Sequence, residues 1–188
     1  MTENGPDGPN AESPTLRVTR TYLELPSWEQ LDPGAPPSVP SRLCPLPADP
    51  SGLQHWRRLY ASVGAPYRWF DRDGWSDERL LAHLRSEGTR AYRGEAELPG
   101  GTLADAGILE LARGEDGRIE IVYLGLDRAA HGLGLGRWLV TAAVHAARAA
   151  GGTGVWLHTC TLDGPAALPN YLARGFVPVR TEEYEVPA

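Results

Sequence analysis

The chain contains no lysine, because all 18 of its basic residues are arginine. A Walker phosphate loop needs a Lys after its last Gly, and Schiff-base chemistry or a pyridoxal cofactor needs a Lys amine. The absence of lysine therefore excludes these three kinds of site. Cysteine is nearly absent too, with only Cys44 and Cys160 present. Two cysteines are too few for a disulfide framework, and we expect both to be free thiols.

Long apolar segments are also missing, and positive charge is in deficit. No apolar run approaches the length of a membrane span, and the acidic, polar N-terminus does not resemble a signal peptide. We therefore expect a cytoplasmic protein without a membrane partner. The formal net charge of −6 argues against nucleic acid as a partner, since phosphate contacts need clustered cations. No serine lies in a G-x-S-x-G motif, so a serine hydrolase is not expected.

The length of 188 residues is typical of one domain with a sizeable core. Residues 1–14 are rich in Gly, Pro, Asn and Asp and are predicted to form a disordered tail. Residues 15–188 are then the single domain. Within it, the proline-rich residues 26–50 predict an extended loop, which is either a passive tether or a lid over a substrate site.

Alternating apolar residues predict strands, and apolar residues three or four apart predict helices. The expected elements, in chain order, are a strand at 16–25, helices at 50–64 and 76–86, strands at 90–98, 105–113 and 118–126, a helix at 138–150, a strand at 154–160, a helix at 163–174 and a strand at 176–186. Short turns join the three central strands, which predicts antiparallel pairing. A helix connects the next two strands, which predicts parallel pairing. The fold class is therefore α/β of the mixed α+β kind.

A glycine-rich loop, HGLGLG at residues 131–136, follows the strand at 118–126 and precedes a helix. Glycines let a backbone approach a ligand closely, and a helix N-terminus presents unpaired N–H groups and a positive dipole end. The loop therefore predicts a phosphate or pyrophosphate site, although a plain turn between strand and helix is the alternative. A dinucleotide fingerprint does not fit, because the spacing is G-x-G-x-G and no acidic residue follows before Asp163.

The loop resembles the acyl-CoA loop of the GNAT acetyltransferase superfamily, [Q/R]-x-x-G-x-[G/A], with His131 in the Gln/Arg position. The order of elements resembles the GNAT fold, which has a central, mostly antiparallel sheet, splayed central strands and flanking helices. In this family the pantetheine arm of the coenzyme lies between the splayed strands. The resemblance implies acetyl-CoA as co-substrate and no metal. The implied coenzyme-binding residues are Leu124, Gly125, Leu126, His131, Gly132, Leu133, Gly134, Leu135, Gly136, Arg137 and Asp163.

Acetylation of an amine needs a base, because the free amine is mostly protonated at neutral pH. Glu120 is the predicted base, since burial in its Ile/Val-rich strand would raise its pKa. A solvent-facing Glu120 is the alternative, with Glu110 as the reserve. Tyr171, in a Tyr-x-x-x-Gly-Phe ending that resembles the family, is predicted to assist the leaving thiolate or else to be a core residue. The family often has Asn seven residues earlier, where this chain has Gly164, so that contact is absent or passes to Asp163.

The remaining candidates are weaker. Trp69, Phe70 and Trp75 could line a substrate pocket or belong to the core. His158 and Cys160 share one strand face, but two ligands do not make a metal site. The leading interpretation is an acyl-CoA-dependent N-acyltransferase that acetylates a primary amine of a small molecule or peptide, as a monomer or homodimer. A non-catalytic acyl-CoA-binding or regulatory module is the alternative.

Overall fold

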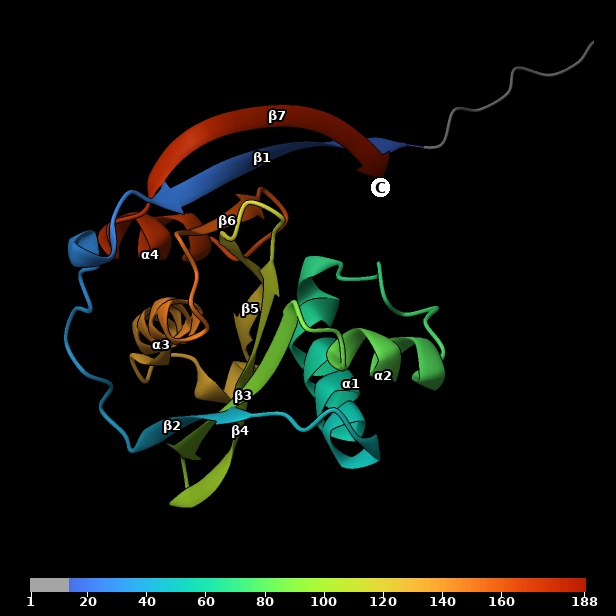
Figure 1. The fold of residues 1–188 in the computed structure, drawn as a ribbon, viewed down its shortest axis with the longest axis vertical. Helices are drawn as coiled ribbons and strands as arrows, with labels where there is room; N and C mark the ends of the chain where they lie inside the picture. The colour runs from blue at the N-terminus through green and yellow to red at the C-terminus, as the bar shows by residue number, and fades with distance from the viewer. Residues whose placement is uncertain (1–13) are drawn as a thin grey trace, which may run out of the picture.

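The computed structural model describes residues 14–188, so the predicted disorder of residues 1–13 lies outside the described residues. Its centre is a seven-stranded sheet in the order β2-β3-β4-β5-β6-β1-β7 (Figure 1). The strands are β1 (Thr15–Leu25), β2 (Ser41–Pro45), β3 (Thr89–Leu98), β4 (Thr102–Arg113), β5 (Ile119–Leu126), β6 (Val155–Cys160) and β7 (Val177–Pro187). The helices are α1 (Pro50–Gly64), α2 (Asp77–Leu84), α3 (Leu135–Ala149) and α4 (Ala167–Ala173), with short 3-10 turns η1 (Trp28–Gln30), η2 (Ala65–Tyr67) and η3 (Arg128–Ala130).

The helices form a layer on each face of the sheet. Helices α1 and α2 cover one face, and α3 and α4 cover the other (Figure 1). The predicted apolar stripe of α3 is buried against the sheet, and every member of it is at most 1% exposed. These residues are Leu139, Val140, Ala143, Val144 and Ala147. No helix in the described part of the chain has the length and apolar character that a membrane span requires.

The local signals in the sequence explain most of the element boundaries. The Asp49 carboxylate accepts hydrogen bonds from the backbone N–H groups of Ser51 and Gly52, at 2.9 and 3.0 Å, and caps α1. The Ser76 hydroxyl accepts a hydrogen bond from the Arg79 N–H at 3.2 Å and caps α2. The predicted antiparallel pairing of β3, β4 and β5 and the parallel pairing of β5 with β6 are confirmed.

The prediction of a continuous loop over residues 26–50 is wrong. The segment contains η1 and also β2, which pairs antiparallel with β3 from Ser41 opposite Ala96 to Pro45 opposite Tyr92. An edge strand tolerates proline, because only one of its sides joins the hydrogen-bonded ladder. The many prolines therefore limit this strand to five residues at the edge without preventing it.

The first strand of the chain is inserted near the far end of the sheet. Strand β1 lies between β6 and β7 and pairs antiparallel with both. The strand that immediately precedes α1 is therefore β2, and the proline-rich segment crosses from one end of the sheet to the other between them (Figure 1). The alternation of residues 16–25 correctly indicates a strand, but periodicity carries no information about its neighbours.

Candidate functional site

Strands β5 and β6 separate after a short paired stretch. Their parallel pairing covers only Ile119–Ile121 against Val155–Leu157. The pairing ends at a bulge in β5. In the register of β5 against β4, Leu111 pairs with Ile121 and Glu110 with Tyr123, so Val122 is an extra residue between two paired ones. A bulge interrupts the ladder and bends a strand. From this point β5 follows β4 and β6 follows β1, so the expected splay of the central strands is present.

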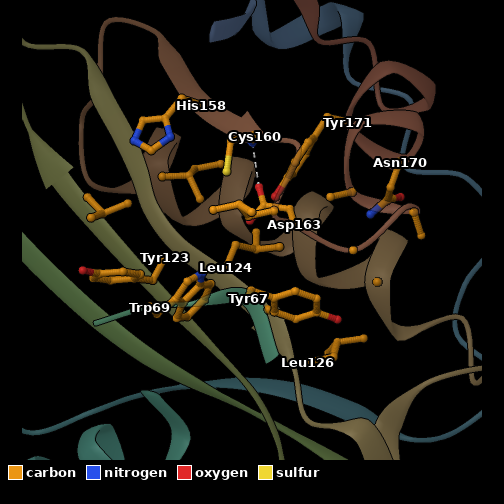
Figure 2. Close-up of a pocket in the computed structure, with 18 of the residues that line it drawn as sticks. Tyr67, Trp69, Tyr123, Leu124, Leu126, His158, Cys160, Asp163, Asn170 and Tyr171 are labelled. Carbon is orange, nitrogen blue, oxygen red and sulfur yellow. Dashed lines mark hydrogen bonds between the residues drawn. The ribbon is translucent and has the colours of Figure 1, made fainter. Parts of the chain in front are cut away.

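A cavity of about 910 Å³ occupies the space between the separated strands. Figure 2 shows His158 and Cys160 of β6 on one side of it and Tyr123 and Leu124 of β5 on the other. Beyond Ile121 the β6-facing edge of β5 has no strand partner among residues 14–188. Free backbone N–H and C=O groups along a strand edge can pair with an extended ligand that contains amides. The edge of β5 can therefore pair with a ligand of this kind.

The glycine loop forms one end of this cavity. Gly132 and Gly134 have left-handed backbones, with φ of +80° and +74°, which only glycine adopts readily. Gly134 is the N-cap residue of α3, and no side chain in the described part of the chain caps this helix end. Because Gly134, Leu135, Gly136 and Arg137 line the cavity, the uncapped N–H groups of α3 are available to an anion.

The proline-rich segment supports the glycine loop from outside the cavity. Arg137 donates from Nε to the carbonyl oxygen of Ala35 at 2.6 Å, and Ser38 donates from N and Oγ to that of Leu133 at 3.3 and 3.1 Å. No residue of 26–50 lines the cavity. The segment is therefore a tether, and the lid interpretation has no support. Since the Arg137 side chain is engaged here, its contribution to an anion site is its backbone N–H.

His131 lines the cavity with an exposed side chain whose Nε2 lies 3.4 Å from the carbonyl oxygen of Leu126. We expect His131→Ala to weaken CoA binding only modestly, because the loop acts through N–H groups and the helix dipole. Titration calorimetry with CoA is the measurement. A loss above roughly 3 kcal/mol would exceed the value of one charge-assisted hydrogen bond and would make His131 essential.

Glu120 is not among the residues that line the cavity. Its side chain is 26% exposed, and its Oε1 lies 3.8 Å from Nε2 of His158, which does line the cavity. Burial raises the pKa of Glu120, whereas nearby Arg20 opposes this shift. Burial, followed by the charge of Arg20, lowers the pKa of His158. The imidazole is therefore neutral at pH 7, and it lines the cavity with Glu120 as its neighbour.

Glu110, the reserve base, is part of a buried ion cluster on the α1–α2 side of the sheet. It is 0% exposed, and its carboxylate accepts hydrogen bonds from Trp56 Nε1 and from Arg72 Nη1, both at 2.8 Å. Nε2 of His83 lies 2.9 Å from the same carboxylate. Glu110 does not line the cavity, so its geometry is that of a structural residue.

Tyr171 and Asp163 meet at the α4 side of the cavity (Figure 2). Burial raises the pKa of Tyr171 far above its usual value, with a further contribution from the charge of Asp163. The Tyr171 ring packs edge-on against Phe176, with centroids 6.1 Å apart. Asp163 Oδ2 accepts hydrogen bonds from Thr159 Oγ1 at 2.5 Å and from the Cys160 N–H at 2.9 Å. Asp163 therefore fixes the turn after β6.

Only Trp69 of the three predicted substrate aromatics lines the cavity. Its ring packs on that of Tyr123, with centroids 4.9 Å apart. Phe70 is 59% exposed and lies outside the lining, and Trp75 stacks under Arg79 at 4.0 Å, away from the cavity. Asp71, which no sequence pattern indicated, is a lining carboxylate that accepts a hydrogen bond from the Tyr123 hydroxyl.

Two residues of the α4 region were also missed. Asn170 lines the cavity beside the glycine loop, where its Nδ2 would lie 3.6 Å from a Cβ added to Gly136. An amide side chain is therefore present here, although from Asn170 rather than from position 164. Arg174 lines the cavity one helical turn further on. Among residues 14–188 no group of three His, Cys, Asp or Glu side chains is arranged to hold a metal ion.

The comparisons with known proteins agree with this geometry. A family model described as Acetyltransferase (GNAT) family matches residues 53–176, which is more than half of the chain. A GCN5-related N-acetyltransferase from Kribbella flavida has a similar structure, with a TM-score of 0.59, 17% identity and coverage of 91% of this chain and 58% of that one. The sequence matches no curated protein.

Two further solved structures have a similar fold. A Drosophila protein matches with a TM-score of 0.58, 14% identity and coverage of 93% of this chain and 53% of that one. A GCN5-related N-acetyltransferase-like protein from Streptococcus suis matches with a TM-score of 0.56, 13% identity and coverage of 93% and 63%. The chain thus spans between about half and two thirds of the length of these structures. At such identities the likeness concerns the fold.

Proposed function

The chain belongs to the GNAT acetyltransferase family, and on this premise we propose that it transfers an acetyl group from acetyl-CoA to a primary amine. The acceptor amine is carried by a small molecule or a peptide. The observation that carries the proposal is the splay of β5 from β6, which opens a cavity ending at the uncapped N-terminus of α3. One cavity thus offers a strand edge for an amide-containing arm and an anion site for a pyrophosphate.

The coenzyme supplies an acetyl thioester, and the residues of the chain bind it and handle the protons. The open edge of β5 at Leu124–Leu126 pairs with the amides of the arm. The backbone N–H groups of Gly134, Leu135 and Gly136 hold the pyrophosphate. Trp69 and Tyr123 then form an aromatic wall beside the acceptor.

His158 accepts the proton of the attacking amine, directly or through water. It faces the cavity, and its lowered pKa keeps the imidazole neutral at pH 7. Glu120, 3.8 Å behind it, acts through His158 by stabilising the imidazolium that forms. In this arrangement the predicted base Glu120 is a positioning residue, because it does not line the cavity.

Tyr171 is expected to donate a proton or hydrogen bond to the departing sulfur. Because its pKa is raised far above the usual value, its hydroxyl stays protonated throughout the working pH range. Tyr171→Phe should therefore lower turnover evenly with pH, rather than remove a basic limb of the profile. Steady-state rates across pH are the measurement. The ring still packs on Phe176, so the melting temperature should be unchanged, and full activity of the variant would make Tyr171 a packing residue.

The direct test is to incubate the purified protein with acetyl-CoA and a panel of primary amines and to detect the released thiol. Thermal unfolding with acetyl-CoA, NAD and ATP accompanies it. Of these three ligands, we expect only acetyl-CoA to stabilise the folded protein. At an acetyl-CoA concentration ~100 times the dissociation constant, the free energy of unfolding should rise by roughly 2.7 kcal/mol. Thiol release that depends on one class of amine would support the proposal, and the absence of any binding to acetyl-CoA would refute it.

A non-catalytic acyl-CoA-binding module is the second candidate. The position of Glu120 outside the cavity lining favours it, because the predicted base does not touch the acceptor space. This function predicts stabilisation by acetyl-CoA without thiol release for any amine. It also predicts that a conservative substitution of His158 leaves the stabilisation by acetyl-CoA largely unchanged.

A further inference from the structure

Arg174 is a buried arginine that has no acidic partner in the described part of the chain. It follows α4, is 8% exposed and lines the cavity. None of the ion pairs formed by residues 14–188 includes it, and its Nε is buried without a hydrogen-bond partner. A guanidinium stays charged in proteins, and burying it unpaired costs free energy. Such a group is suited to bind an anion from outside the chain.

The surrounding backbone does not replace this anion. The carbonyl oxygens of Ala35 and Pro36 accept hydrogen bonds from Arg137, and that of Pro33 accepts one from Thr141. Gly34 has a left-handed backbone with φ of +63°, and a Cβ added to it would lie 3.0 Å from Nη2 of Arg174. The tether therefore closes tightly over one side of the guanidinium without pairing it, and the cavity is its open side.

The cavity that Arg174 lines also contains the glycine loop, which suggests the kind of anion that Arg174 binds. Arg174 and Asn170 are four residues apart, so they share one face of the α4 turn, and Asn170 lies beside Gly136. Arg174 is thus one turn of α4 away from Asn170, and Asn170 lies beside the N-terminus of α3, where the pyrophosphate binds in the proposed function. Coenzyme A carries one further phosphate, the monoester on the 3′ position of its ribose. This phosphate is a separate charge at the nucleotide end of the molecule.

We propose that Arg174 binds the 3′-phosphate of the coenzyme, and thereby makes the protein select 3′-phosphorylated acyl-CoA over the dephosphorylated form. The inference rests on the proposed function, since it assumes that CoA occupies this cavity. The planar guanidinium donates two parallel hydrogen bonds to phosphate oxygens, which a lysine ammonium cannot reproduce. The phosphate supplies the counter-charge that Arg174 lacks in the free protein.

The experiment is a ligand and variant cycle measured by titration calorimetry. CoA and 3′-dephospho-CoA are titrated into the wild-type protein and into Arg174→Met, a substitution that retains an unbranched apolar stem. We expect the wild type to bind CoA about ten- to a hundredfold more tightly than dephospho-CoA. Arg174→Met should remove this preference and leave the affinity for dephospho-CoA unchanged. Arg148→Met is the matched control, because Arg148 is exposed on α3 and lies 3.8 Å from Glu29.

Melting of the ligand-free proteins gives a second readout. If the Arg174 side chain is unpaired in the ligand-free protein, Arg174→Met should have a melting temperature no lower than that of the wild type, because a buried unpaired charge has been removed. A lower melting temperature together with equal losses for both ligands would show a structural role and would overturn the inference. Equal affinity of the wild type for CoA and dephospho-CoA would overturn it without any variant. If neither ligand binds the wild type, the proposed function itself fails, which is a different result from CoA binding without discrimination.

Discussion

Replacing Gly134 with valine is expected to abolish the stabilisation of the protein by acetyl-CoA. Gly134 has a φ of +74°, which a β-branched residue adopts only with strain. An added Cβ would also lie 2.6 Å from Nη2 of Arg137, whose side chain binds the tether. The substitution therefore distorts the N-terminus of α3 and places a branched side chain where the pyrophosphate must approach. The measurement is thermal unfolding with and without acetyl-CoA.

Gly101→Val is the matched control for this variant. Gly101 has a φ of +78° in the turn between β3 and β4, and nothing lies within 4 Å of a Cβ added there. It therefore carries a similar backbone strain without touching the cavity. We expect Gly101→Val to lower the melting temperature and still respond fully to acetyl-CoA. A Gly134→Val protein that responds as fully as this control would place the coenzyme elsewhere.

The sequence predicted the elements of the fold better than their arrangement. Caps at Asp49 and Ser76 and the apolar stripe of α3 act over a few residues, so they can be read locally. The position of β1 between β6 and β7 depends on pairing with residues far away in the sequence, such as Arg20 opposite Cys160. Strand β2 was missed because prolines surround it, and an edge strand needs only one hydrogen-bonded side.

In the candidate site, too, the sequence predicted local features and not those that depend on distant residues. The glycine loop was predictable, because closely spaced glycines between a strand and a helix are a local signal that favours a close backbone approach at a helix N-terminus. The bulge at Val122 was not, since it exists only in the register of β5 against β4. This bulge sends β5 away from β6 and leaves Glu120 outside the cavity while His158 faces it. Arg174 could not be recognised either, because a buried unpaired charge is visible only once its neighbours are placed.

Removing the imidazole of His158 is expected to lower turnover by about 10²- to 10⁴-fold, which is the usual value of a positioned general base. His158→Gln is the variant, since it keeps a polar side chain of similar length. The base acts when neutral, so activity is lost as the pH falls through its pKa. Because burial and Arg20 lower that pKa, the acidic limb of the wild-type profile should lie below the ordinary histidine range. Rates with an accepted amine across pH provide the measurement.

Glu120→Gln distinguishes the role of Glu120 from that of His158. It removes a negative charge 3.8 Å from the imidazole, so the pKa of His158 falls and the acidic limb moves to lower pH, with a smaller loss of turnover than in His158→Gln. The affinity for CoA should stay the same in both variants, since neither residue contacts the glycine loop. If instead Glu120→Gln abolishes the acidic limb while His158→Gln retains it, the carboxylate is the base and reaches the amine through water. If both variants keep wild-type turnover, water takes the proton and the pair serves only to pack β5 against β6.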